Sequence, residues 1–319
     1  MANMMLIIVK LIRLFVLMFG IISATFLIVH YGFEKDYADT LIKYVDFLKQ
    51  VMHWDFGVST VTGQPIFSEI ISRWPATIEL GLIAMLISIV IGIPLGVIAA
   101  THQNKPLDRF LISLSLIGYS MPTFWLALIL ILFFSVGLDL TPVSGRLDIM
   151  YDITPVTGLM LVDTLLKPVI QQYHFNAFYS AVSHLILPAI VLASVPTAVF
   201  ARMTRGSLLE ILSQDFILSA RARGLSEYRV LLIHGLRNAL TPILSVGGLH
   251  FITTVITGSI VAELIFGWPG IGSYIIQSVY ARDYGVVQVF LLSMGLMVLL
   301  MNTLIDVIIF LISPRTLIR

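Results

Sequence analysis

The residues best suited to a chemical role form one short polar stretch, Gln214–Leu225, between two long apolar segments. Its sequence, QDFILSARARGL, combines an acid with two arginines and with the small residues Ala220, Ala222 and Gly224. Small side chains let another protein surface approach a helix closely, so the stretch is predicted to be a water-facing docking element. The alternative is a basic loop that rests on anionic lipid headgroups.

Local signals predict a short helix in this stretch. Ser213 is suited to begin it as an N-cap, and Gly224, just past Arg223, is suited to end it in a left-handed conformation. Three apolar residues at positions i, i+1 and i+4 are expected to form one edge of the helix. They are Phe216, Ile217 and Ala220.

Enzymatic chemistry finds little support in the sequence. The seven histidines are scattered, none at metal-ligand spacing, and the chain has no cysteine and no Walker A loop. The apolar segments carry almost no ionisable residue near their centres, which argues against a secondary transporter that couples by itself. The chain is therefore not expected to be an enzyme, and energy is expected to come from a partner. A channel subunit is the alternative function.

The elements that must position this polar stretch are hydrophobic. Of the 319 residues 58% are hydrophobic and 12% charged, and the mean hydropathy is +0.98. These values predict an all-α, polytopic membrane protein with a single transmembrane domain over residues 1–319. The six expected spans are about 6–29, 76–100, 109–137, 181–200, 239–261 and 286–312, with a basic segment at 201–237. A cleaved signal peptide is the alternative for the first span.

Charge segregation predicts the orientation. The two ends of the chain, the hairpin Thr101–Asp108 and the 201–237 segment, with flanking residues, hold 12 of the 19 basic residues and five of the 18 acidic ones. The other side keeps the remaining basic residues and most of the acidic ones. The positive-inside rule then makes both termini cytoplasmic. The segments 31–75, 139–179 and 263–285 are predicted to lie on the opposite side of the membrane, which is the periplasmic side if the membrane is the bacterial inner membrane that the family resemblance below implies.

The docking stretch resembles a known family. Asp215–Ser226, followed by Arg237–Pro242 (RNALTP), is similar to the cytoplasmic coupling segment of ABC-importer permeases, more narrowly the B-type permease of dipeptide, oligopeptide and nickel importers. Leu218 stands where the general importer pattern has Glu, as is common in the peptide branch. The resemblance implies that eight residues contact an ATPase partner: Asp215, Phe216, Ser219, Ala220, Arg221, Ala222, Arg223 and Gly224.

Further short stretches match the same family in register along nearly the whole chain. They are His53–Ser59, Arg73–Leu80, Gly92–Val97, Pro142–Arg146, His184–Pro188, Glu263–Gly272, Ala281–Tyr284, and Asn302 with Asp306. Within the family, Pro155–Gly158 and the short first periplasmic segment look most similar to the Sap-type peptide transport permease.

The resemblance implies a type I ABC-importer permease fold and a complex of several subunits. The partners would be a second homologous permease subunit, two cytoplasmic ATP-binding subunits and a periplasmic solute-binding protein, in a lipid membrane and without nucleic acid. ATP and Mg would bind the partner subunits, and no cofactor is expected in this chain. The substrate would be a cationic peptide or polyamine, or a di- or oligopeptide, or nickel.

Four residues are candidates for the transport pathway or for helix packing. Asn302 and Asp306 lie one helical turn apart and could both face the interior of the bundle. His184 and Pro188 either line the pathway or bend the fourth span. Pro188 and Pro196 are expected to interrupt that span, and Gly92-Ile93-Pro94-Leu95-Gly96 to break the second one, as a kink or a close packing contact.

Overall fold

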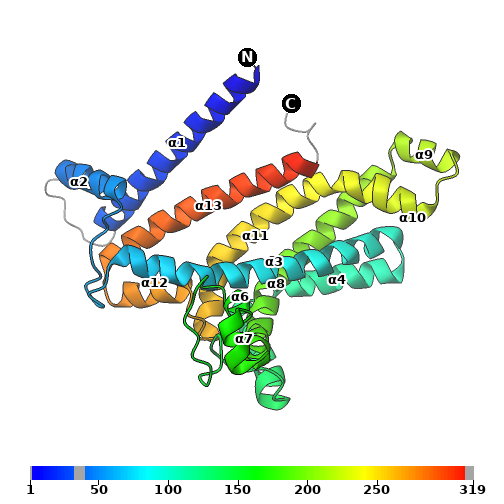
Figure 1. Cartoon of the computed structure of the whole chain (residues 1–319). Helices are drawn as coiled ribbons and strands as arrows, with labels where there is room; N and C mark the ends of the chain where they lie inside the picture. The colour runs from blue at the N-terminus through cyan, green and yellow to red at the C-terminus, as the bar shows by residue number, and fades with distance from the viewer. Residues whose placement is uncertain (1, 32–39, 313–319) are drawn as a thin grey trace. The chain divides into compact units, whose positions relative to one another are not determined.

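The computed structural model describes residues 2–31 and 40–312 (Figure 1). Regular structure in these ranges is helical apart from one isolated bridge between Val58 and Pro65, which confirms the all-α prediction. The chain divides into two compact units. The first comprises Met1–Thr77 and Pro269–Met301, the second Ile78–Trp268 and Asn302–Arg319. The predicted basic tail, 313–319, lies outside the described residues.

The first unit contains short and long helices from both ends of the chain. They are α1 (Ala2–Val29), α2 (Thr40–His53), α12 (Ile271–Tyr280), the first turns of α3 (Ile66–Thr101) and most of α13 (Tyr284–Ile312). Aromatic side chains join α1 to α2: the ring of Phe26 lies 5.2 Å from that of Tyr44 and 5.8 Å from that of Phe47. The segment 31–75, expected to be a polar excursion, thus carries a helix of its own.

The second unit is built around one long central helix, α8 (Asn176–Leu212), which packs along α11 (Arg237–Ile265) and α4 (Pro106–Ser120). Its remaining elements are the rest of α3, α5 (Thr123–Leu130), the π-helical η2 (Ile131–Gly137), α6 (Met160–Asp163), α7 (Lys167–Tyr173), α9 (Asp215–Ala222), α10 (Glu227–Arg229), the π-helical η3 (Val230–Leu236) and the end of α13.

The core of this unit depends on glycines where helices approach closely. The fully buried Phe200 of α8 covers Gly247 of α11, where a Cβ atom would lie 2.2 Å from the Phe200 ring. A Cβ on Gly96 of α3 would lie 2.5 Å from the backbone oxygen of Ala201. Helix α3 runs unbroken through Gly92–Gly96, so the predicted break is wrong and these glycines serve close packing against α8.

Each of the six predicted spans falls on helical structure. Among the residues that the structure describes, four helices are long and apolar enough to cross a membrane: Ile66–Thr101, Asn176–Leu212, Glu227–Ile256 and Tyr284–Ile308. A bent pair, Pro106–Ser120 with Thr123–Gly137, makes a fifth if it counts as one span, and Phe15–Val29 is a shorter apolar helix. Helices α3 and α8 extend well beyond the predicted spans 76–100 and 181–200.

The third predicted span, 109–137, is not one continuous helix. The chain bends by 102° between α4 and α5, at Met121 and Pro122. Proline has no backbone N–H and disfavours the helical region for the residue before it, and Met121 is extended with φ −72° and ψ 129°. The prediction treated 109–137 as one span because the run is long and mostly apolar, and it gave no weight to Pro122.

The fourth predicted span, in contrast, is not interrupted. Helix α8 is continuous through Pro188 and Pro196, so that expectation was wrong. Near Pro196, Ser88 of α3 donates a hydrogen bond to the backbone oxygen of Ala193 at 3.2 Å. The carbonyl that Pro196 leaves without its helical donor is that of Leu192, so the Ser88 bond ties α3 to α8 beside the proline and does not replace the missing bond.

Candidate functional site

The predicted docking stretch forms a helical hairpin beyond the end of α8, which we call the island (residues 213–230) (Figure 1). Its helix α9 ends in a Schellman motif: the Leu225 N–H donates to the Ala220 oxygen at 3.4 Å, and the Gly224 N–H to the Arg221 oxygen at 2.9 Å. Gly224 has φ +75°, which confirms the predicted left-handed stop. Ser213 does not cap α9; Gln214 holds that position, while the Ser213 hydroxyl bonds to Glu210 in α8.

An apolar base holds the island together. Ile217, Ala220 and Val230 are at most 1% exposed and pack with Leu212 and Leu225. Burial of a side chain such as Ile or Val contributes about 1.5–3 kcal/mol. The base therefore stabilises the hairpin within this chain, without help from a partner.

The outward face of α9 differs from the predicted edge. Phe216 is 39% exposed, as expected of a docking residue, but Ile217 and Ala220 face inward and Leu218, at 58%, is exposed instead. The other predicted coupling residues are all exposed: Asp215, Ser219, Arg221, Ala222, Arg223 and Gly224. The docking role of these residues stays a prediction, and for Ala220 the buried position makes that role indirect.

One ion pair spans the island. The Arg221 guanidinium donates to both carboxylate oxygens of Glu227, at 2.9 and 3.2 Å. Because the two side chains are 40% and 72% exposed, the pair contributes at most about 1 kcal/mol. Breaking this ion pair, so that either side chain could bond elsewhere, would therefore cost little free energy.

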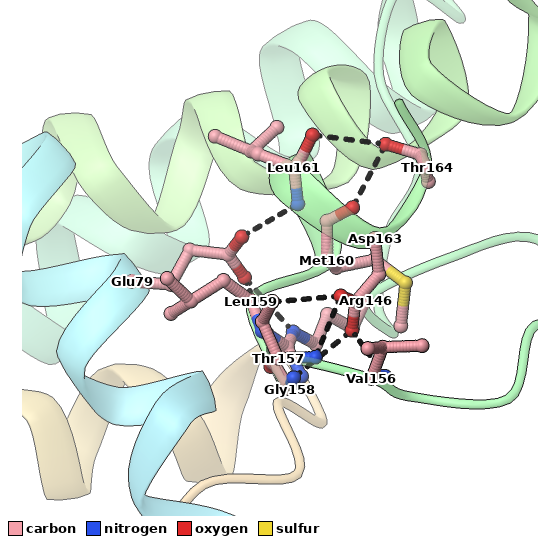
Figure 2. A network of polar contacts seen from close by, with 10 residues as sticks. All are labelled: Glu79, Arg146, Val156, Thr157, Gly158, Leu159, Met160, Leu161, Asp163 and Thr164. Carbon is pink, nitrogen blue, oxygen red and sulfur yellow. Dashed lines mark hydrogen bonds and ion pairs between the residues drawn. The ribbon is translucent and has the colours of Figure 1, made fainter. Parts of the chain in front are cut away.

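A second polar site lies in the same unit, on the segment between η2 and α8 (Figure 2). Glu79 of α3, 4% exposed, accepts hydrogen bonds from Nε (3.1 Å) and Nη2 of Arg146, which is 12% exposed. The other Glu79 oxygen accepts from the Leu161 N–H at 2.7 Å. Arg146 also donates to the Gly158 oxygen at 2.7 Å and lies 5.5 Å from the centre of the Trp268 ring. These contacts fasten the segment 145–161 to α3.

Asp163, fully buried, organises the turn of that segment (Figure 2). Its carboxylate accepts the Thr157 hydroxyl at 2.7 Å and the backbone N–H groups of Val156, Thr157 and Gly158 at 2.9–3.2 Å. Burial by itself would raise the pKa of Asp163, but these hydrogen bonds outweigh burial and lower it. The carboxylate is thus held ionised as the centre of a rigid turn.

The first unit contains a similar buried carboxylate. Asp283 accepts hydrogen bonds from the Ser59 hydroxyl at 2.6 Å and the Thr60 N–H at 3.0 Å. Nearby in this unit, the Tyr274 hydroxyl donates to Glu69 at 2.7 Å, and burial together with this bond raises the Tyr274 pKa. These bonds tie the segment before α3 to the α12–α13 turn.

The four candidate pathway residues are placed differently from one another. The Nδ1 atom of His184 lies 2.7 Å from the Ser180 oxygen, and Pro188 is buried inside α8, so both have structural surroundings. Asn302 is half-buried, whereas Asp306 is exposed on α13. An interior position for Asp306 within this chain is therefore wrong, and a pathway role of the four residues stays a prediction.

The sequence did not single out the buried carboxylates or their donors. The stretches that resemble the family contain two such pairs, Glu79 with Arg146 and Asp283 with Ser59, but nothing in one sequence indicated which residues are in contact. Asp163 carried no signal other than its position after a Pro-Val-Thr-Gly turn.

Long apolar helices, together with a polar helical hairpin whose outer face is exposed, define a polytopic membrane protein. Residues 92–318 match the family described as binding-protein-dependent transport system inner membrane component. The chain therefore belongs to this family, that of the membrane-spanning permeases of bacterial ABC transporters, which work in complexes with other subunits.

Similar proteins cover most of the chain. The di/tripeptide transport system permease protein DppB of Pseudomonas aeruginosa (strain UCBPP-PA14) is 46% identical over 86% of this chain and 80% of its own length. The dipeptide transport system permease protein DppB of Escherichia coli (strain K12) is 43% identical, with the same shares. The putrescine export system permease protein SapB of Escherichia coli (strain K12) is 36% identical over 90% of this chain and 91% of its own length.

A solved structure shares the fold. An inward-facing structure of the MetNI methionine ABC transporter matches with a TM-score of 0.58 and 19% identity, over 78% of this chain and 98% of the matched chain. At this identity the match supports the type I permease fold and no more.

Proposed function

We propose that the chain is the permease half of an ATP-driven importer of short peptides in a bacterial inner membrane. The observation that carries the proposal is the 46% identity to a di/tripeptide permease over 86% of the chain. The buried base and exposed face of the island support the same reading, because they form a stable surface on which another subunit can dock.

The proposed complex contains a second permease subunit, two cytoplasmic ATP-binding subunits that hold ATP and Mg, and a periplasmic solute-binding protein. Nucleotide binding brings the ATPase subunits together, and the island moves with them. The permease then shifts between inward-facing and outward-facing populations. This chain itself holds no cofactor and catalyses no reaction in the scheme.

The docking face is tested with an exposed residue. Ala220→Arg would disrupt the island's own base, since Ala220 is 1% exposed. Phe216→Asp is sharper: it should abolish binding of the ATPase subunits while the protein stays in the membrane. Phe175→Asp is the matched control, because Phe175 is also exposed, at 53%, but lies at the other end of α8. Unchanged ATPase binding by the Phe216 variant would refute the docking role.

The orientation is tested with single cysteines in a chain that has none. Cysteines at the exposed positions Thr62, Met150 and Tyr280 should react with an impermeant thiol reagent added to spheroplasts. A cysteine at Gln214 should not react until the membrane is opened. The reverse pattern would place the island outside the cell and exclude cytoplasmic ATPase partners.

The substrate is tested by transport in the reconstituted complex. Relatives named for dipeptides or di/tripeptides share 43–46% of their aligned residues with this chain, whereas those named SapB share 36–37%. We therefore favour dipeptides over a Sap-like substrate. A neutral dipeptide, an arginine-rich peptide and putrescine should be compared, with inward and outward transport measured separately. Preference for the neutral dipeptide is expected. Outward putrescine transport would favour the SapB-like function instead.

A further inference from the structure

One ion pair connects the first turn of α4 to the part of α8 that leads into the island. The Arg205 guanidinium of α8 donates to both carboxylate oxygens of Asp108, from Nε at 2.6 Å and from Nη2 at 2.7 Å. Asp108 is 2% exposed and Arg205 28% exposed, so the pair is largely shielded from water. The Asp108 carboxylate also accepts the Asn104 N–H at 2.9 Å, which fixes the hairpin itself.

Further contacts join the same two helices. The Arg202 guanidinium lies 4.5 Å from the centre of the Tyr119 ring of α4. The tight approach of Gly96 to Ala201 holds α3 against the same part of α8. Helices α3 and α4 therefore both pack against the last third of α8, which leads into the island.

A pocket lies between the end of α3 and the island. The pocket has a volume of about 600 Å³ and is lined by Thr101 and Gln103 as well as by Arg221 and Tyr228 of the island. Along α8 the island is connected to Arg205, and the ion pair with Asp108 continues this connection to α4.

We propose that the Asp108–Arg205 pair is a positioning device that transmits movement of the island to α4 and, through it, to the bend at Met121 and Pro122. The inference rests on the proposed function, because it requires an ATPase partner that moves the island. Two charges held in bidentate geometry in shielded surroundings resist separation far better than an exposed pair such as Arg221–Glu227.

A distance measurement in the complete reconstituted complex tests the movement. Spin labels on cysteines at the exposed positions Gln103 and Glu210 report the separation of hairpin and α8. In the otherwise unchanged chain this distance should stay the same between the nucleotide-free and the ADP–vanadate-trapped complex, because the two elements move as one body. In Asp108→Asn the distribution should broaden and differ between the two states.

Coupling provides the second readout. For Asp108→Asn, ATP hydrolysed per dipeptide transported should rise roughly fivefold, within the range found for residues that carry coupling. The double variant Asp108→Asn/Arg205→Gln should be no worse than either single variant, because the pair acts as a unit. The control Lys105→Gln removes an exposed charge of the same hairpin and should change neither readout.

The outcomes separate this inference from the proposed function. An unchanged distance and unchanged ATP consumption in Asp108→Asn would overturn the positioning role while ATP-driven transport by the wild-type complex stands. If Asp108→Asn does not assemble, Arg205→Lys keeps the charge but loses the bidentate geometry, and its unchanged coupling would overturn the role as well. A wild-type complex that shows no ATP-driven transport would overturn the proposed function.

Discussion

Glutamine in place of Glu79 should loosen the segment between η2 and α8. The substitution keeps the size of the side chain but removes the charge opposite Arg146, and the new amide N–H₂ must face either Arg146 or the Leu161 N–H. Both are donors, so at least one buried hydrogen bond is lost. Arg146 is then left as an uncompensated charge that is only 12% exposed.

The expected cost follows from that burial. Removal of one partner from a buried ion pair costs about 3–5 kcal/mol. For a chain of this size each kcal/mol lowers Tm by roughly 2 °C, so Glu79→Gln should lower it by about 6–10 °C at a fixed scan rate. The control Asp46→Asn breaks a pair whose side chains are 56–65% exposed, and it should cost at most about 1 kcal/mol.

A thiol-labelling assay reports the segment directly. Thr164 is fully buried, and the chain has no cysteine, so Thr164→Cys places one protected thiol next to Asp163. The thiol should react faster with a maleimide when Glu79→Gln is added, and Glu79→Met/Arg146→Met should restore part of the protection because no buried charge remains. Equal labelling rates and an unchanged Tm in Glu79→Gln would refute the assignment of Glu79 as the anchor.

Three further substitutions follow from the geometry, with Gly206→Ala as a common control because a Cβ there meets nothing within 4 Å. Gly224→Ala should destabilise the island by about 1 kcal/mol, since its φ of +75° is unfavourable for a residue with a Cβ, and weaker association with the ATPase subunits would report it. Gly96→Ala should lower stability by about 1–3 kcal/mol in thermal unfolding, because its Cβ would lie 2.5 Å from a backbone oxygen of α8. The pKa of Asp163 in the folded chain is lowered from its ordinary value of 3.8. The ionised carboxylate therefore stabilises the fold fully at pH values above 3.8, and this stabilisation is lost as the pH falls through the pKa of the folded chain. The hydrogen-exchange protection factors of residues 156–164, which correct for the slower intrinsic exchange in acid, should therefore fall at strongly acidic pH. In Asp163→Asn they should already be lower at neutral pH.

Much of the architecture could be predicted from sequence because it depends on local or compositional signals. Apolar runs longer than the bilayer thickness predict helices wherever they occur, and Gly224 marks a helix end because few other residues adopt its conformation. The bend at Met121 and the unbroken course of α8 could not be predicted. Pro122, Pro188 and Pro196 all lie in largely apolar runs. Whether a helix continues through a proline depends on whether its surroundings satisfy the carbonyl that the proline leaves without a donor, and that is set by other segments of the chain.

The contents of the site were harder to predict for a related reason. An ion pair is a property of two segments, and Glu79 and Arg146 are 67 residues apart while Ser59 and Asp283 are 224 residues apart. Several stretches that resembled the family one by one are partners in the structure: Arg73–Leu80 contacts Pro142–Arg146, and His53–Ser59 contacts Ala281–Tyr284.

A buried charge is costly unless its partner is present, so each stretch makes physical sense only with the other. The second unit therefore stabilises its charged groups differently in two places. Glu79 is paired with Arg146, and Asp163 is held by hydrogen bonds from a hydroxyl and from backbone N–H groups, so the buried charges favour one fixed conformation of the segment 145–161. On the island the charges are exposed, and the stability comes from the apolar base of Ile217, Ala220 and Val230. High salt should accordingly weaken docking on the island while it leaves the Glu79–Arg146 anchor intact, because exposed charges are screened and buried pairs are not.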